Sequence, residues 1–193
     1  YLILANILCV VLLWLYSTNF KKSLLTGNIV ISLLTAWTIL IIFFSKFNLT
    51  DAFGAGDSNN HKFFRLAILY AGFAFIISLI REAIKDMQDM AGDAKYGCRT
   101  MPIVWGLNAA KVYVAVWLVV LIAILVVVQF YVLQFRWWLP VTYSFALIVA
   151  PMLYIFYRLF SAVSPADFHR LSRWIKTVML TGILSMIFFY FFL

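Results

Sequence analysis

Most acidic residues of this sequence lie in one short stretch. Only seven of the 193 residues are Asp or Glu, and four of them fall within residues 81–106: Glu82, Asp86, Asp89 and Asp93. Each residue advances about 100° around an α-helix, so these four carboxylates would share an arc of roughly 60° on one face. Neighbouring carboxylates on a helix repel each other by about 0.2–0.5 kcal/mol per pair. A hard cation such as Mg²⁺ would offset that repulsion, so the spacing predicts a Mg²⁺ site.

Basic residues are interleaved with these acids: Arg81, Lys85, Lys95 and Arg99. The alternative to a metal site is a solvated charged turn between two membrane helices. Such a turn gives its acids no reason to keep helical register, so the metal site is the favoured interpretation. Gly92 is expected to loosen the last helical turn, which weakens the case for Asp93.

The composition is that of a membrane protein. Hydrophobic residues make up 66% of the chain and charged residues 11%, and the mean hydropathy is +1.02, whereas roughly a quarter of the residues in a soluble domain are charged. Backbone polar groups in lipid must be paired internally, and the apolar runs are too long for β-barrel strands. We therefore expect an all-α, polytopic transmembrane bundle. The two cysteines and two histidines have no zinc or disulfide spacing, and no catalytic triad, phosphate loop or nucleic-acid module is visible.

Apolar runs of about 20 residues predict six membrane spans in one transmembrane domain, residues 1–193. The spans are expected at residues 1–16, 24–44, 63–80, 108–128, 136–157 and 177–193. Residues 45–62 form a predicted surface loop, and residues 158–176 a basic connector. Asn108 is the predicted N-cap of the fourth span, and Pro151 is expected to kink the fifth.

The basic residues also predict an orientation, because Lys and Arg favour cytoplasmic loops. Six spans place eleven basic residues on one side of the membrane and four on the other: Lys46, Lys62, Arg65 and Arg136. The richer side includes Lys21, the acidic stretch, Lys111 and the connector at residues 158–176. We therefore expect a multi-pass protein of the cell (inner) membrane with the acidic stretch on the cytoplasmic side.

Two segments resemble motifs of a known family. Residues 81–93, R-E-A-I-K-D-M-Q-D-M-A-G-D, are followed at residues 97–106 by G-C-R-T-M-P-I-V-W-G. Together they closely resemble the second aspartate-rich motif of the UbiA-type intramembrane prenyltransferases, in which Asp86, Asp89 and Asp93 match the three acidic positions. Residues 16–28 resemble a second family segment, Y-S-x-x-x-K-K followed by G-N. The resemblance covers essentially the whole chain.

The resemblance implies nine membrane helices with two aspartate-rich motifs facing each other across a cavity. The six spans predicted here would correspond to the fourth through ninth helices. The first family motif, N-D-x-x-D-x-x-x-D, has no counterpart in these 193 residues. The expectation is therefore an N-terminally truncated chain that lacks three helices and is inactive as it stands.

The resemblance also implies a reaction: Mg²⁺-dependent transfer of an isoprenyl group from a polyprenyl diphosphate to a lipophilic acceptor. Metal ions bound by Asp86, Asp89 and Asp93 would bridge the diphosphate and neutralise its developing charge. The residues implied in diphosphate binding are Arg81, Lys85, Lys95, Arg99, Lys21, Lys22 and Tyr16. For the basic residues the alternative role is topology alone, and for Tyr16 it is an interfacial anchor.

The acidic motif is most similar to the digeranylgeranylglyceryl phosphate synthase branch of the family. That branch transfers a geranylgeranyl group to a geranylgeranylglyceryl phosphate-type lipid. The alternative within the family is prenylation of an aromatic quinone precursor of the naphthoate, homogentisate or hydroxybenzoate type. From other classes, a membrane transporter with a cation site and a purely structural membrane subunit are also considered. Transporter sites lie near the middle of the membrane, whereas these acids follow the end of a span, so the enzyme is favoured.

Overall fold

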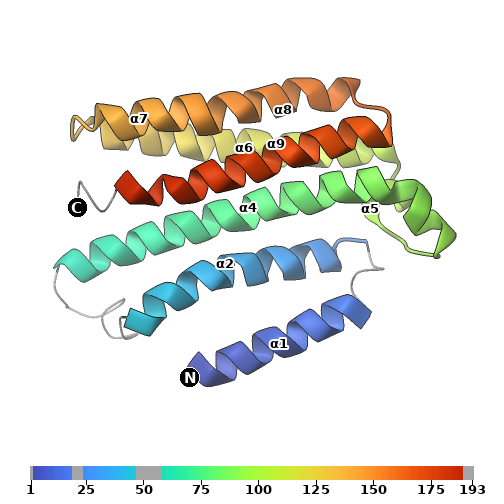
Figure 1. Ribbon diagram of the computed structural model, residues 1–193, viewed down its shortest axis with the longest axis horizontal. Coiled ribbons are helices and arrows are strands. Elements are labelled where there is room, and N and C mark those ends of the chain that lie inside the picture. The colour runs from blue at the N-terminus through green and yellow to red at the C-terminus, as the bar shows by residue number, and fades with distance from the viewer. Residues whose placement is uncertain (1, 19–23, 47–57, 189–193) are drawn as a thin grey trace. The chain divides into compact units, whose positions relative to one another are not determined.

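The computed structural model describes residues 2–18, 24–46 and 58–188 of the chain, and in these ranges the regular structure is helical throughout (Figure 1). The all-α prediction is confirmed. Five helices are long and apolar enough to cross a membrane, and a shorter apolar helix precedes them, so the chain is a multi-pass membrane protein. The chain divides into two compact units, Tyr1–Leu79 and Ile80–Leu193, which are described separately. The single transmembrane domain and the match to the fourth through ninth family helices stay predictions.

The first unit contains α1 (Leu2–Thr18), α2 (Thr26–Lys46) and the first part of α4 (Ser58–Lys95). Helices α1 and α2 lie side by side and run in opposite directions. Phe43 of α2 meets Phe64 of α4 with ring centroids 5.4 Å apart. These three helices lie where the first three spans are predicted. Residues 47–57 of the predicted surface loop lie outside the described residues.

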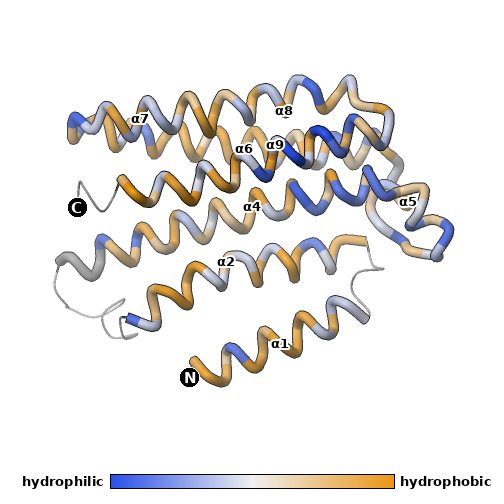
Figure 2. Tube along the Cα trace, in the orientation of Figure 1, coloured by the Kyte–Doolittle hydropathy of each residue, from blue (hydrophilic) through white to orange (hydrophobic). Residues whose placement is uncertain are grey.

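Helix α4 joins a membrane span to the acidic stretch without interruption. Its 38 residues correspond to about 57 Å at 1.5 Å per residue, well beyond the ~30 Å of a hydrocarbon core. The helix becomes hydrophilic towards its C-terminal end, next to α5 (Figure 2). Gly92 lies inside the helix, which continues to Lys95, so the prediction that Gly92 loosens the last turn is wrong. The carboxylates therefore lie on a helix that continues directly from a membrane span.

The second unit contains the rest of α4, the short α5 (Met101–Val104), α6 (Leu107–Leu133), α7 (Trp138–Ser144), the π-helical turn η2 (Phe145–Val149), α8 (Ala150–Ser161) and α9 (Pro165–Leu184). Helices α7, η2 and α8 are consecutive, and α8 packs against both α6 and α9. The N-cap of α6 is Gly106, so the prediction of Asn108 as the cap is wrong by two residues. Gly106 has φ = 86°, a backbone conformation that glycine adopts without strain.

The proline in the fifth predicted span lies beside a π-helical turn. Helix α8 begins directly after η2, and Pro151 is its second residue. Pro151 has no N–H to donate to the carbonyl of Leu147, four residues earlier. Thr181 of α9 supplies a donor instead, since its Oγ1 lies 2.9 Å from the Leu147 carbonyl oxygen. The same hydroxyl lies 3.1 Å from the Val178 carbonyl oxygen. Tyr143 Oη donates to the Thr181 carbonyl (2.9 Å), which adds a second polar link between these segments.

Most of the predicted connector at residues 158–176 is helical, so that prediction is wrong. A capping box starts α9: Ser164 Oγ accepts from the Asp167 N–H (3.3 Å), and the Asp167 carboxylate accepts from the Ser164 N–H (3.1 Å). Pro165 occupies the first turn, where its missing N–H costs nothing. The connection between α8 and α9 is therefore only residues 162–164, and the basic residues of this region lie on helices.

Candidate functional site

The candidate site is the C-terminal part of α4 and the turn that follows it. Because α4 is helical to Lys95, the helical spacing assumed for the acids applies, and Asp86, Asp89 and Asp93 share an arc of about 60°. All three are partly exposed. The most deeply buried residues of this segment lie on another arc, about 60° to 160° around the helix from Asp86: Ile80, Ala83, Ile84 and Met87. The acids therefore lie off the packed face of the helix.

Glu82 lies at the N-terminal end of the same arc and differs from the three aspartates. It is only 6% exposed, and its Oε1 accepts a hydrogen bond from Arg81 Nη1 in an ion pair. A buried carboxylate without a partner would be strongly destabilising, and Arg81 supplies that partner for Glu82. The predicted diphosphate ligand Arg81 therefore also has an ion-pair partner within the chain, Glu82.

Three carboxylates in a row on a helix cannot all hold one small ion. Asp86 and Asp93 are separated by about 10 Å along the axis, and their side chains lean the same way. Mg²⁺ binds its oxygen ligands at about 2.1 Å, so only neighbours such as Asp86 and Asp89, about 4.5 Å apart along the axis, can share an ion. Within residues 2–18, 24–46 and 58–188, no group of three or more His, Cys, Asp or Glu side chains is arranged to hold a metal. The arrangement fits an ion bound by one or two carboxylates, with water and substrate oxygens completing its shell.

The glycine and threonine positions of the motif form the turn after α4. Gly97 has φ = 70° and ends the helix, with its N–H bonded to the Ala94 carbonyl (3.2 Å) and the Cys98 N–H bonded to the Asp93 carbonyl (3.0 Å). This pattern is a Schellman cap, which satisfies carbonyls left free at a helix end. The chain then reverses through Arg99 and Thr100 into α5, so the G-x-R-T-x-P pattern encodes a compact turn beside the acids.

Thr100 is a residue of this turn that sequence reasoning did not single out. It is the N-cap of α5 and only 3% exposed. Among the described residues its buried Oγ1 has no hydrogen-bond partner, although buried hydroxyls are usually paired. The signal in the sequence is its place before Met101-Pro102, since threonine before a proline-containing first turn is typical of a helix start.

The other predicted diphosphate ligands are distributed over the chain. Lys85 is half-buried on α4, whereas Lys95 and Arg99 are exposed on either side of the Schellman cap. Tyr16 is half-buried near the end of α1, in the other unit of the chain. Lys21 and Lys22 lie outside the described residues. The structure therefore brings together the α4 residues and the turn, and the remaining assignments stay predictions.

Lys111, one of the basic residues of the predicted cytoplasmic side, has a structural role. It lies on α6 and is only 6% exposed. Its Nζ donates to the carbonyl of Phe160, at a distance of 3.3 Å, near the C-terminal end of α8. A cation at this position complements the negative end of the helix dipole and satisfies a free carbonyl. The sequence shows the charge but not this partner, which is 49 residues away.

Comparisons with known proteins agree with the resemblance of the motif. The model of the UbiA prenyltransferase family matches residues 1–180. A digeranylgeranylglyceryl phosphate synthase of Methanosphaera stadtmanae is 30% identical over 182 residues, which are 93% of this chain and 59% of the relative. One from Methanospirillum hungatei is 35% identical over 105 residues, 54% of this chain and 32% of the relative.

The chain spans at most 59% of the length of these two relatives. No solved structure gives a significant match. The family model nevertheless covers most of the sequence, including the α4 acids and the turn after them. The chain belongs to the UbiA prenyltransferase family.

Proposed function

We propose that the whole protein transfers an isoprenyl group from a polyprenyl diphosphate to a lipophilic acceptor, and that this acceptor is a geranylgeranylglyceryl phosphate-type lipid. The observation that carries the proposal is the similarity to relatives named digeranylgeranylglyceryl phosphate synthase, one of which matches 93% of this chain. The activity is proposed for the whole protein, because the chain spans 59% of that relative's length.

The proposed reaction breaks the allylic C–O bond of the donor and forms a C–O bond to a hydroxyl oxygen of the acceptor. The hydroxyl proton and inorganic diphosphate are released. Negative charge builds up on the diphosphate as the bond breaks, so groups that bind this charge lower the barrier. Mg²⁺ held by the acidic arc would act as the Lewis acid at the diphosphate.

The residues of α4 support these roles by their positions. Asp86 and Asp89 are proposed to hold one ion, and Asp93 is proposed to contribute through a second ion one turn further on. Lys85 and Arg81 lie about 40° and 80° beyond Asp89 on the same helix. A diphosphate bound to metal on the acidic arc would therefore have cationic side chains on its flank, with Lys95 and Arg99 at the following turn.

We further propose that this end of α4 lies on the cytoplasmic side of the cell (inner) membrane. The asymmetry of eleven basic residues against four supports this orientation. Lys85, Lys95 and Arg99 would then serve both topology and substrate binding. Tyr16, Lys21 and Lys22 are proposed as further contacts to the diphosphate, on the strength of their match to the family segment.

The test is a prenyl-transfer assay on the protein purified from its native membrane, with the polypeptide defined by intact mass. Geranylgeranyl diphosphate is the donor, and geranylgeranylglyceryl phosphate and 4-hydroxybenzoate are offered separately as acceptors. We expect transfer to the lipid phosphate only, and a loss of at least 100-fold in kcat for Asp86→Asn and Asp89→Asn. Gln88→Asn, on α4 but off the acidic arc, is the matched control and should retain activity.

Three outcomes would contradict the proposal in different ways. Transfer to the aromatic acid alone would refute the lipid acceptor and retain the enzyme class. Absence of transfer to either acceptor, with cation flux in proteoliposomes lacking any donor, would favour a transporter. Full activity of both aspartate variants would refute the role of the α4 acids.

A further inference from the structure

A second charged site lies between α8 and α9 and is formed by residues other than those of the acidic arc. A cavity of about 160 Å³ opens beside the short connection at residues 162–164. It is lined from α8 by Tyr154 and Arg158 and from α9 by Asp167, Arg170 and Trp174, with Leu171 at its base. The volume is several times the ~30 Å³ that one water molecule occupies in the liquid. The cavity can therefore admit a chemical group larger than water.

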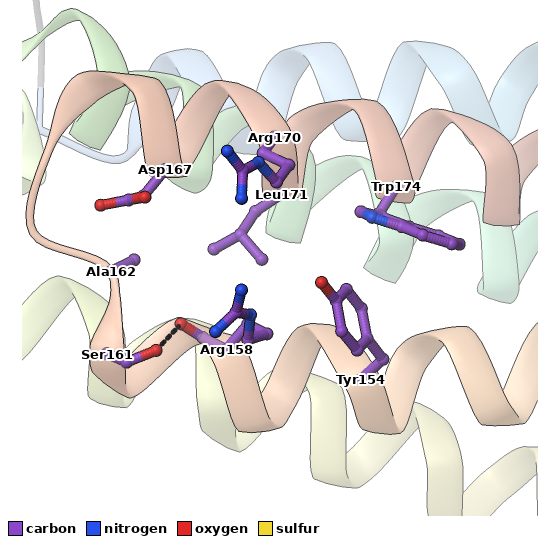
Figure 3. A pocket seen from close by; sticks show the side chains of 8 residues that line it. All are labelled: Tyr154, Arg158, Ser161, Ala162, Asp167, Arg170, Leu171 and Trp174. Carbon is purple, nitrogen blue, oxygen red and sulfur yellow. Dashed lines mark hydrogen bonds between the residues drawn. The ribbon is translucent and has the colours of Figure 1, made fainter.

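Two guanidinium groups face each other across this cavity. Arg158 and Arg170 extend towards one another from the two helices (Figure 3). Among the described residues, neither Arg158 nor Arg170 forms an ion pair with a carboxylate. Two like charges directed into one space are unfavourable unless an anion lies between them. Arginine pairs are well suited to phosphate, because each guanidinium can donate two parallel hydrogen bonds.

The carboxylate at the cavity is occupied by the turn. Asp167 Oδ2 accepts from Ser164 Oγ (2.8 Å), from the Ser164 N–H (3.1 Å) and from the Val163 N–H (3.3 Å). The bond from the Ser164 N–H belongs to the capping box of α9. Together the three bonds hold the carboxylate at the end of the cavity next to the connection, while it attracts Arg170 at longer range. The cavity thus retains a net positive charge.

The opposite end of the cavity is aromatic. The rings of Tyr154 and Trp174 lie 5.2 Å apart and tilted by 57°, and the Arg158 Cζ atom lies 6.0 Å from the centre of the Tyr154 ring. Both rings are 38% exposed, and tyrosine and tryptophan are enriched where membranes meet water. From the connection inward, the cavity therefore changes from cationic to aromatic.

The positions of the lining residues along their helices agree with this change from cationic to aromatic. Helices α8 and α9 both belong to candidate membrane spans, Trp138–Ser161 and Pro165–Phe188, whose ends meet at residues 162–164. Arg158 and Tyr154 lie about 4.5 and 10.5 Å along α8 from its last residue, Ser161. With Ser161 placed at the membrane surface, Arg158 lies at the depth of the lipid headgroups and Tyr154 just inside the hydrocarbon core, given that a bilayer is about 40–45 Å thick around a ~30 Å core.

We propose that the cavity between α8 and α9 binds the phosphate group of an anionic membrane phospholipid. Arg158 and Arg170 clamp the phosphate, and the Tyr154–Trp174 pair packs against the glycerol backbone and the first acyl carbons. Basic pockets between membrane helices are a known mode of anionic lipid recognition. Free inorganic phosphate would satisfy the arginines but leave the aromatic end unused, which is why we assign the site to a lipid. The inference does not depend on the prenyl-transfer proposal.

The test measures lipid binding by the full-length protein in neutral detergent. The apparent Kd for short-chain phosphatidylglycerol, phosphatidylcholine and inorganic phosphate is determined from the shift in Tm with ligand concentration. We expect phosphatidylglycerol to bind, phosphatidylcholine to bind at least tenfold more weakly, and inorganic phosphate to give no shift. Arg158→Gln and Arg170→Gln should each weaken phosphatidylglycerol binding about tenfold, which corresponds to one lost charged contact.

Arg173→Gln is the matched control, because Arg173 is an exposed arginine on α9 that does not line the cavity. It should bind phosphatidylglycerol as the unaltered protein does. If a glutamine variant does not fold, the lysine variant at the same position (Arg158→Lys or Arg170→Lys) replaces it and should weaken binding by a smaller factor. Equal phosphatidylglycerol affinity in cavity and control variants would overturn the proposal. Binding of inorganic phosphate as tight as that of phosphatidylglycerol would overturn the assignment to a lipid.

Discussion

The ion pair between Arg81 and Glu82 predicts a larger loss of stability when Arg81 is replaced than when Glu82 is replaced. The Glu82 side chain is 8% exposed and the Arg81 side chain 30% exposed. Replacing Arg81 with Gln leaves a nearly buried carboxylate without its partner. Removing one partner of a fully buried pair costs about 3–5 kcal/mol, and the partial exposure of Arg81 places our expectation at about 3 kcal/mol. Replacing Glu82 with Gln leaves a guanidinium that can turn towards solvent, so that loss is expected to be about 1 kcal/mol.

The assay is reversible unfolding in mixed micelles for both single variants and for the double variant Arg81→Gln/Glu82→Gln. Because the double variant leaves no unpaired charge, it should be at least about 1 kcal/mol more stable than the sum of the two single losses implies. Arg81→Lys is the control that retains a positive charge. Equal losses in the two single variants, or strictly additive losses in the double variant, would refute the reasoning from burial.

The same variants separate two roles of Arg81. A purely structural residue would change the free energy of unfolding and leave the KM for the diphosphate donor unchanged. A diphosphate ligand would raise that KM in Arg81→Gln even at temperatures where the variant is fully folded. The double variant is informative here, since it removes the diphosphate contact while relieving the unpaired charge of Glu82.

Two further changes test local features of the fold by thermal unfolding. Gly97→Ala should destabilise the protein by about 1 kcal/mol, because φ = 70° is unfavourable for a residue with a Cβ. Gly92→Ala should be neutral or stabilising by up to about 1 kcal/mol, because Gly92 lies inside α4 and nothing lies within 4 Å of an added Cβ. Equal effects of the two variants would contradict the Schellman cap. Thr181→Val should cost about 1 kcal/mol through loss of its bond to the Leu147 carbonyl, and Thr181→Ser, which keeps the hydroxyl, should retain most of that stability. A loss in Thr181→Ser with none in Thr181→Val would show that the methyl group, and not the hydroxyl, matters.

The helices could be predicted from the sequence because lipid leaves few alternatives. A long apolar run in a membrane must pair its own backbone groups, so composition alone indicates a helix. The prediction was less accurate where polar residues decide the ends. Residues 158–176 were expected to connect two spans because they are basic, but Ser164 and Asp167 form a capping box that starts α9. The S-P-A-D pattern at residues 164–167 is a helix-start signal in the sequence itself, and it outweighs the basic character of the segment.

The sequence by itself determined the register of the acids, since Asp86, Asp89 and Asp93 follow helical spacing and α4 is helical through all three. It also determined the membrane class and the family motif. Only the tertiary structure decided that Glu82 is buried, that Lys111 bonds to the end of α8, and that Arg158 and Arg170 meet across a cavity (Figure 3). The physical reason is that helical periodicity specifies which residues share a face of one helix. Burial and the approach of charges from two helices depend instead on how those helices pack.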